Sequence, residues 1–85
     1  MKVDVVKVFD RLPKKAQEHL VEFREVFVDD YKELTAHNNE VTRGTLQMDA
    51  FLIRGYCHAL EDVGLITLEE KQALRAWLLE RGGLV

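Results

Sequence analysis

Apolar residues recur at helical spacing along most of the chain. Between Pro13 and about Ala36 they step by fours and threes, which places them on one face of a helix at about 100° per residue. These positions are Ala16, Leu20, Phe23, Phe27, Tyr31 and Leu34. Pro13 suits the first position of this helix, where its missing N–H costs nothing. Val21, Val26 and Val28 widen the apolar sector beyond what one neighbouring helix would cover.

The segment from Val3 to Leu12 is compatible with two structures. Its β-branched residues favour a strand. Its apolar positions also follow helical spacing, and Asp4 is suitable as an N-cap. A single strand in an otherwise helical chain would pair only with a second subunit. We therefore predict a short helix, whose apolar positions are Val5, Val8, Phe9 and Leu12.

The middle of the chain predicts a loop followed by a third helix. The polar composition from His37 to Gly44 is typical of a loop. Apolar spacing then predicts a helix from about Thr45 to Val63. The residues expected on its inward face are Met48, Leu52, Ile53, Tyr56, Ala59, Leu60 and Val63.

A sharp boundary is predicted after this third helix. Gly64 is suited to end it in the left-handed conformation, with Leu65 contacting Leu60 as in a Schellman motif. Thr67 and Glu70 are spaced as a capping box, which marks the start of the next helix.

The last predicted helix runs from about Leu68 to Arg81 and ends at Gly82-Gly83. Its expected buried residues are Ala73, Leu74, Trp77 and Leu78. The sequence thus predicts an all-α fold in a single helical domain over residues 1–85. We expect a small bundle of three principal helices with a short N-terminal helix, antiparallel where the loops are short.

Composition narrows the functional classes. The 85 residues include 12 basic and 15 acidic side chains, for a net charge of −3, which argues against a general affinity for nucleic acid. No apolar run approaches the roughly 18–20 residues of a membrane span. Asp4 lies where a signal peptide would have its apolar core, and Cys57 is the lone cysteine. We therefore expect a cytoplasmic protein without disulfides.

A search for catalytic or metal chemistry finds no plausible site. His19, His37 and His58 are about twenty residues apart, unlike the close ligand spacing of metal sites. Cys57 and His58 are adjacent on a helix, so their side chains point about 100° apart and do not form a nucleophile–base pair. Asp62 lies one turn after His58, which is typical of a solvated surface pair. We expect no enzyme activity, no metal and no cofactor.

Asp49 falls within the apolar sector of the third helix, near Ile53. A carboxylate there needs a partner or an interface. One interpretation places it near the helix N-terminus, stabilised by free N–H groups. The other is a salt bridge at a partner or subunit contact, with Arg43 or Arg54 as the cation.

A row of carboxylates follows the predicted outer face of the second helix. Like charges one turn apart repel each other, and Lys15 and Lys32 offset this only in part. The row is either a solvated face or a docking surface for a basic protein partner. Its members, which we call the acidic row, are Glu18, Glu22, Glu25, Asp29 and Glu33.

The excess apolar surface predicts a homodimer, because a small domain gains stability from a shared core. Phe51 lies off the apolar sector, beside Gly55 and Asp62, and is a further candidate for partner contact. The expected dimer or core residues are Phe23, Phe27, Tyr31, Leu52, Tyr56 and Trp77.

The stretch from Arg54 to Thr67, followed by Glu69-Glu70, resembles the helix–turn–helix punctuation of small helical accessory proteins encoded by phages and prophages. The resemblance implies a protein that binds and disables a host protein, such as a CRISPR effector, a restriction enzyme or the transcription machinery. The excess apolar surface, the acidic row and the lack of a catalytic site lead to the first hypothesis, a homodimeric protein-interaction module that inhibits or regulates a larger partner.

Two other functions are weighed against this one. A helix-turn-helix DNA-binding regulator is the second hypothesis, but Leu68-Glu69-Glu70 would bring acidic residues to the phosphates. A small enzyme is the third, and it lacks a site.

Overall fold

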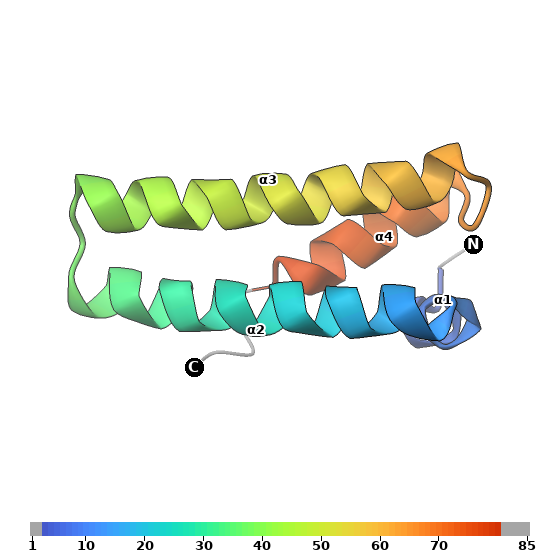
Figure 1. Ribbon diagram of the computed structural model, residues 1–85, viewed down its shortest axis with the longest axis horizontal. Helices are drawn as coiled ribbons and strands as arrows, with labels where there is room; N and C mark the ends of the chain where they lie inside the picture. Colours follow the sequence, from blue (N-terminus) through green and yellow to red (C-terminus); the bar gives the residue numbers. More distant parts are fainter. Residues whose placement is uncertain (1–2, 81–85) are drawn as a thin grey trace.

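Four α-helices make up the part of the chain that the computed structural model describes, residues 3–80. They are α1 (Val5–Arg11), α2 (Lys14–Ala36), α3 (Glu40–Asp62) and α4 (Leu68–Leu78) (Figure 1). These residues contain no β-strand, which confirms the all-α class and the helical interpretation of the N-terminal segment. Within this part of the chain, no helix combines the length and apolar character needed to cross a membrane.

The starts of α1 and α2 follow from their capping residues. The Asp4 carboxylate accepts hydrogen bonds from the backbone N–H groups of Val6 and Lys7 at 3.2 and 3.4 Å. These donors would otherwise lack partners at the helix start, so the predicted N-cap is confirmed. Pro13 is the residue before α2 rather than its first residue, and its carbonyl accepts from Gln17 at 3.0 Å.

α3 begins five residues earlier than the sequence predicted. The Asn39 side chain accepts from the backbone N–H of Thr42 at 3.0 Å, and the Thr42 hydroxyl accepts from the Asn39 N–H at 3.1 Å. This reciprocal cap starts the helix at Glu40 instead of Thr45. The predicted loop from His37 to Gly44 was therefore wrong from Glu40 onward. The reason is that this polar segment contains the two residues that cap the helix.

The boundary between α3 and α4 has the predicted form. Gly64 adopts a φ of 80°, the left-handed region that glycine favours. The Leu65 N–H donates to the Leu60 carbonyl at 3.0 Å, as in a Schellman motif. Thr67 and Glu70 form the expected reciprocal capping box at the start of α4.

α2 and α3 lie side by side as an antiparallel hairpin, and α4 crosses the half of it nearer α1 (Figure 1). Each of the two long helices has 23 residues and is therefore about 34 Å long. The Arg24 guanidinium donates to the Leu78 carbonyl at 2.7 Å and joins α2 to α4. An Arg11–Glu70 ion pair at 2.7 Å joins α1 to α4.

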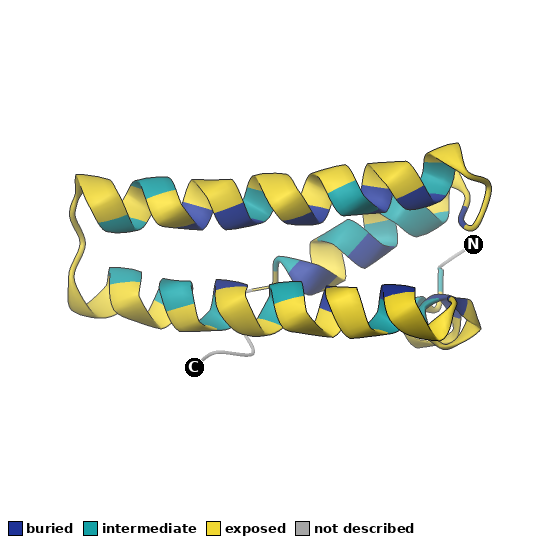
Figure 2. Ribbon diagram, viewed as in Figure 1, coloured by how far each residue is buried: buried dark blue, intermediate teal, exposed yellow. Residues whose placement is uncertain are grey.

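The core lies where these helices face one another (Figure 2). The predicted face of α2 is correct: Ala16, Leu20 and Phe27 are buried, and its other members are half-buried. The buried apolar residues are Val8, Leu12, Ala16, Leu20, Phe27, Leu46, Ile53, Cys57, Leu60, Ile66, Leu74 and Leu78.

The predicted inward face of α3 was only partly right. Ile53 and Leu60 are buried and Tyr56 is half-buried. The remaining four expected positions are exposed: Met48, Leu52, Ala59 and Val63. The reason is that α3 turns the sector containing Ile53 and Leu60 toward the rest of the molecule, which leaves the neighbouring apolar sector outside.

α4 buries less than predicted. Leu74 and Leu78 are buried, whereas Ala73 is half-buried. Trp77 remains 37% exposed and meets Phe9 edge-on, with ring centroids 5.7 Å apart. The helix ends at Leu78, and the predicted end from Arg81 to Gly83 lies outside the described residues.

Candidate interaction surfaces

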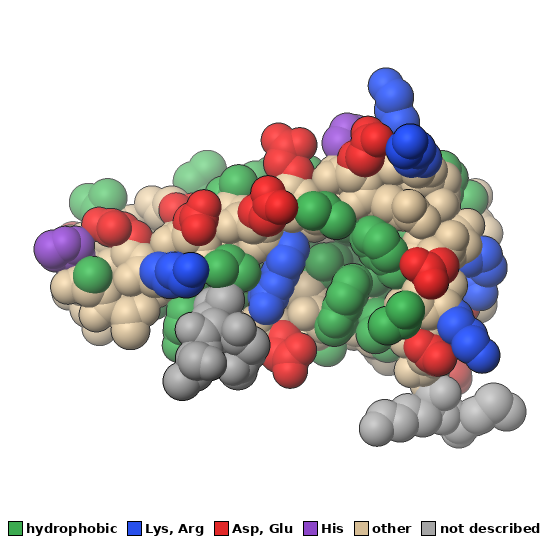
Figure 3. Space-filling view, turned by 90° about the horizontal axis from the view of Figure 1, so that it is seen from below, with side chains coloured by type: hydrophobic (Ala, Val, Ile, Leu, Met, Phe, Trp, Pro, Cys, Tyr) green, Lys and Arg blue, Asp and Glu red, His purple; other side chains and the backbone are tan. Residues whose placement is uncertain are grey.

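The acidic row follows α2 on its outer side. All five of its carboxylates are exposed, as predicted. Figure 3 shows acidic side chains spaced along this helix, with hydrophobic side chains gathered beside them. The acidic row is therefore exposed to solvent and lies next to apolar surface. Its role in partner binding stays a prediction.

A hollow of about 380 Å³ lies beside the N-terminal half of the row. Phe9 and Val21 are its apolar side chains. We call it the acidic-rimmed hollow, lined by Phe9, Lys14, Gln17, Glu18, Val21, Glu22 and Glu25. Sequence reasoning missed this combination because Phe9 comes from α1. The sequence feature that could have indicated this hollow was Val21, an apolar residue between acidic positions of α2.

A smaller hollow of about 110 Å³ shares Phe9, Val21 and Glu25 with the first one. It is also lined by Trp77, whose ring packs edge-on against Phe9. The partly exposed Trp77 thus extends the apolar surface from α2 to α4. Aromatic side chains of this kind dominate the energetics of many protein interfaces.

The predicted dimer or core residues separate into different environments. Phe27 is buried in the core. Phe23 of α2 and Tyr56 of α3 meet edge-on, with ring centroids 5.5 Å apart. The Tyr56 hydroxyl lies 3.1 Å from His19 Nδ1, and burial raises the pKa of Tyr56. The Phe23–Tyr56 contact joins α2 to α3, and the half-buried Tyr31 packs against the core.

Asp49 is buried in the middle of α3, so the interpretation that placed it near the helix N-terminus was wrong. The helix starts at Glu40, so Asp49 is too far along to meet free N–H groups. Its neighbour is a second carboxyl group, that of Asp30 in α2. The Oδ2 atom of Asp49 has no hydrogen-bond partner among the described residues. Arg43 instead donates to Asn38 at 2.8 Å.

The electrostatics of this acid pair follow from burial. Desolvation, together with the hydrogen bond and charge of Asp30, raises the pKa of Asp49 to about 7. A protonated Asp49 can donate to Asp30, whereas two ionised carboxylates repel each other. Asp49 is therefore a source of instability at neutral pH rather than a salt bridge.

Cys57 and the histidines lack the geometry of a reactive site. Cys57 is buried, and burial raises its pKa to about 11 although the charges of Arg75 and Lys71 lower it. A thiol with a raised pKa is a poor nucleophile. His58 lies 3.5 Å from Asp62 with both side chains largely exposed, as expected for a surface pair. Residues 3–80 hold no cluster of three or more metal-ligand side chains of the His, Cys, Asp and Glu types.

A second apolar sector runs along the outside of α3. Its members follow one another at intervals of seven and four residues, which places them within about 60° of the helix circumference. We call them the outer stripe: Val41, Met48, Leu52, Ala59 and Val63. Its four large side chains are between 55% and 76% exposed. Apolar side chains exposed along one side of a helix make this surface a candidate interaction site.

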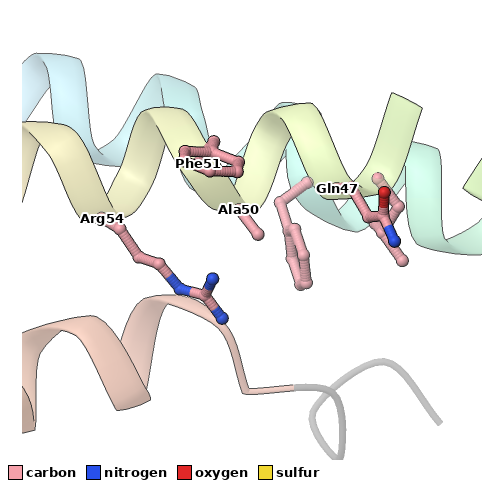
Figure 4. Close-up of a pocket in the computed structure, with 6 residues that line it drawn as sticks. Gln47, Ala50, Phe51 and Arg54 are labelled. Carbon is pink, nitrogen blue, oxygen red and sulfur yellow. The ribbon is translucent and has the colours of Figure 1, made fainter. Parts of the chain in front are cut away.

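Phe51 is 74% exposed, as its position off the predicted sector suggested. It lies between two hollows. One, of about 450 Å³, lies between α2 and α3 and is lined by Phe27, Leu46, Gln47, Ala50, Phe51 and Arg54. Figure 4 shows Arg54 reaching from α3 toward α4 at the edge of this hollow. The other hollow lies between α3 and α4 and has mainly basic lining residues.

Comparison of the chain with protein-family models, curated proteins and solved structures gives no match. The surfaces described above therefore carry the functional argument by themselves.

Proposed function

We propose that the protein is an interaction module that docks a basic, apolar segment of a larger protein partner on the acidic-rimmed hollow. The observation that carries this proposal is the placement of three carboxylates around apolar side chains from two helices. Glu18, Glu22 and Glu25 share one hollow with Phe9 and Val21. An amphipathic helix with lysine or arginine beside leucine complements this surface in shape and charge.

The two components of the surface have different roles in binding. Apolar anchors entering the hollow supply most of the affinity, because they leave water on binding. The acidic row attracts a basic partner during approach and so raises the association rate. Its remaining members, Asp29 and Glu33, extend this field along α2.

The outer stripe of α3 supports the second part of the proposal, that two copies associate. A stripe at seven- and four-residue spacing suits packing against another helix of the same kind. From Val41 to Val63 it extends for about 33 Å. In this proposal each copy is a small helical bundle that pairs through α3 and keeps the acidic-rimmed hollow of α1 and α2 free.

A role as a cytoplasmic inhibitor or regulator of the partner completes the proposal, and a phage origin is one setting for it. The start of α4 favours a protein partner over DNA. Glu69 is exposed there, and Glu70 is engaged with Arg11. Acidic groups at a helix N-terminus repel the phosphates that a DNA-recognition helix must approach.

The proposal is tested with a synthetic helical peptide of leucine and lysine, titrated into isotopically labelled protein and followed by NMR. We expect shifts centred on Phe9, Val21 and Glu22. Binding should weaken as salt increases, because exposed charges are screened over about 8 Å at physiological ionic strength. A peptide of leucine and glutamate serves as the charge control and should not bind.

A matched pair of variants separates the hollow from the general charge of α2. Glu22→Lys alters the rim, whereas Glu33→Lys changes the same charge in the same row outside the hollow. We expect the first to weaken peptide binding several-fold more than the second. Equal losses would mean that the hollow is not the docking site.

A further inference from the structure

A basic hollow of about 300 Å³ lies between α3 and α4. Its basic character contrasts with the net charge of the chain, which is −3. Four of its six lining residues carry basic side chains. The lining residues are Phe51, Arg54, Gly55, His58, Lys71 and Arg75.

The positive charge of this hollow is only partly neutralised. The Lys71 ammonium lies 2.6 Å from a Glu61 oxygen, and His58 is paired with Asp62. Arg54 and Arg75 make no hydrogen bond or ion pair with another residue in the range 3–80. Two guanidinium groups, one from each helix, therefore border the same hollow without a carboxylate partner among the described residues.

The arrangement of these two arginines favours an anion as the missing partner. Guanidinium groups present several N–H donors in a planar fork, which matches the oxygens of phosphate and carboxylate. Arg75 is half-buried, so its charge is less well solvated than that of a fully exposed arginine. Lys71 is held nearby by Glu61 and adds to the local positive field.

Phe51 adds an apolar recognition element to the same hollow. Its ring is largely exposed, although exposing a phenyl group to water is unfavourable. Aromatic rings stack on nucleobases with little dependence on sequence, and arginine also interacts favourably with aromatic faces. The residue thus offers a surface for a planar group next to the two guanidinium groups.

We propose that this hollow binds a mononucleotide, with Arg54 and Arg75 on its phosphate and Phe51 against its base. A phosphomonoester carries a charge of about −1.5 to −2 at neutral pH, which matches two uncompensated arginines. The volume of the hollow lies at the lower end of the range for small-ligand sites. A nucleic-acid polymer fits less well, because Glu61 and Asp62 pair with Lys71 and His58 of the hollow and the net charge of the chain is −3.

The test is an NMR titration of the labelled protein with inorganic phosphate, phenyl phosphate and AMP at constant ionic strength. We expect amide shifts around Arg54, Gly55 and Arg75 with all three ligands. Phenyl phosphate and AMP should bind about 3- to 10-fold more tightly than inorganic phosphate, because only they contact Phe51. Phe51→Ala should remove this difference between the three ligands.

Variants on α3 provide the matched control. Arg54→Gln should weaken AMP binding about tenfold or more, which is typical of losing a charge-assisted hydrogen bond. Arg43→Gln removes the same charge from the same exposed side of the chain but outside the hollow, and should leave binding unchanged. Arg54→Lys keeps the charge but not the planar fork, and should bind with intermediate strength.

Several outcomes would overturn the inference. These are the absence of shifts at millimolar AMP, equal losses in the Arg43 and Arg54 variants, or shifts centred outside the hollow. Tighter binding of a single-stranded oligonucleotide or a phosphotyrosine peptide than of AMP would also contradict it, because the natural ligand would then be a macromolecule. The leucine–lysine peptide tests a different surface, so failure here leaves the proposed function untouched.

Discussion

The two apolar sectors of α3 have similar composition but opposite environments. The inner sector, with Ile53, Cys57 and Leu60, is buried in the core. The outer stripe lies about 100° away around the helix and is exposed along its length. The comparison shows that hydrophobic periodicity identifies the apolar surface of a helix but not which part of it the chain itself covers. In our proposal, a second copy binds the part that is left uncovered.

The largest expected difference between the sectors is in stability. Ile53→Ala removes a fully buried side chain and should lower the free energy of unfolding by about 2–5 kcal/mol. Leu52→Ala, its neighbour on the outer stripe, should lower it by less than about 1 kcal/mol in the monomer. Urea denaturation at low protein concentration measures both values. Similar losses would show that the outer stripe is also packed.

Asp49 lies at the edge of the core and gives the next largest effect, which depends on pH. The folded state holds the Asp49 proton more tightly than the unfolded chain, because burial raises its pKa from 3.8 to about 7. The stabilising protonated form is therefore fully present below about pH 4 and is lost as the pH rises to about 7. The free energy of unfolding should fall by roughly 1–4 kcal/mol across this window.

Asp49→Asn tests this effect, because asparagine cannot ionise. The variant should be more stable than the wild type at pH 7.5 and should lose the slope between pH 4 and pH 7. Asp29→Asn is the control, an exposed aspartate on α2 next to Asp30. If Asp49→Asn leaves the pH dependence of the free energy of unfolding unchanged, Asp49 and Asp30 do not form a buried acid pair.

The smallest effect is expected on the acidic row, where the carboxylates are solvated. Reversal of Glu22 and Asp29 to lysine removes repulsion between like charges one turn apart. We expect the free energy of unfolding to stay constant or to rise by a few tenths of a kcal/mol. A loss above about 1 kcal/mol in thermal or urea denaturation would mean that the row stabilises the fold.

The helix ends show which local features a sequence can reveal. The Schellman end at Gly64 and the capping box from Thr67 to Glu70 depend on a few neighbouring residues, so their prediction was correct. The start of α3 was missed although Asn39 and Thr42 form a similar local cap. Thr42 stands where a glutamate or glutamine is usual in a capping box, which made the signal weaker.

The surfaces depend on contacts between distant residues and were less predictable. The acidic row was visible as a periodic pattern, and Phe51 was correctly expected to be exposed. The apolar side of the acidic-rimmed hollow joins Phe9 of α1 to α2, and the basic hollow joins Arg54 of α3 to Arg75 of α4. No local pattern in the sequence reports such pairings.

The outer stripe is proposed as the surface through which two copies associate, and sedimentation equilibrium of matched variants measures this association. Leu52 and Leu68 are 55% and 53% exposed, but only Leu52 belongs to the outer stripe. At micromolar concentration we predict about twice the chain mass of 9.9 kDa for the wild type and for Leu68→Glu. Leu52→Glu should give the monomer mass with an unchanged circular dichroism spectrum. A wild-type protein that stays monomeric, or two variants that behave alike, would contradict the account.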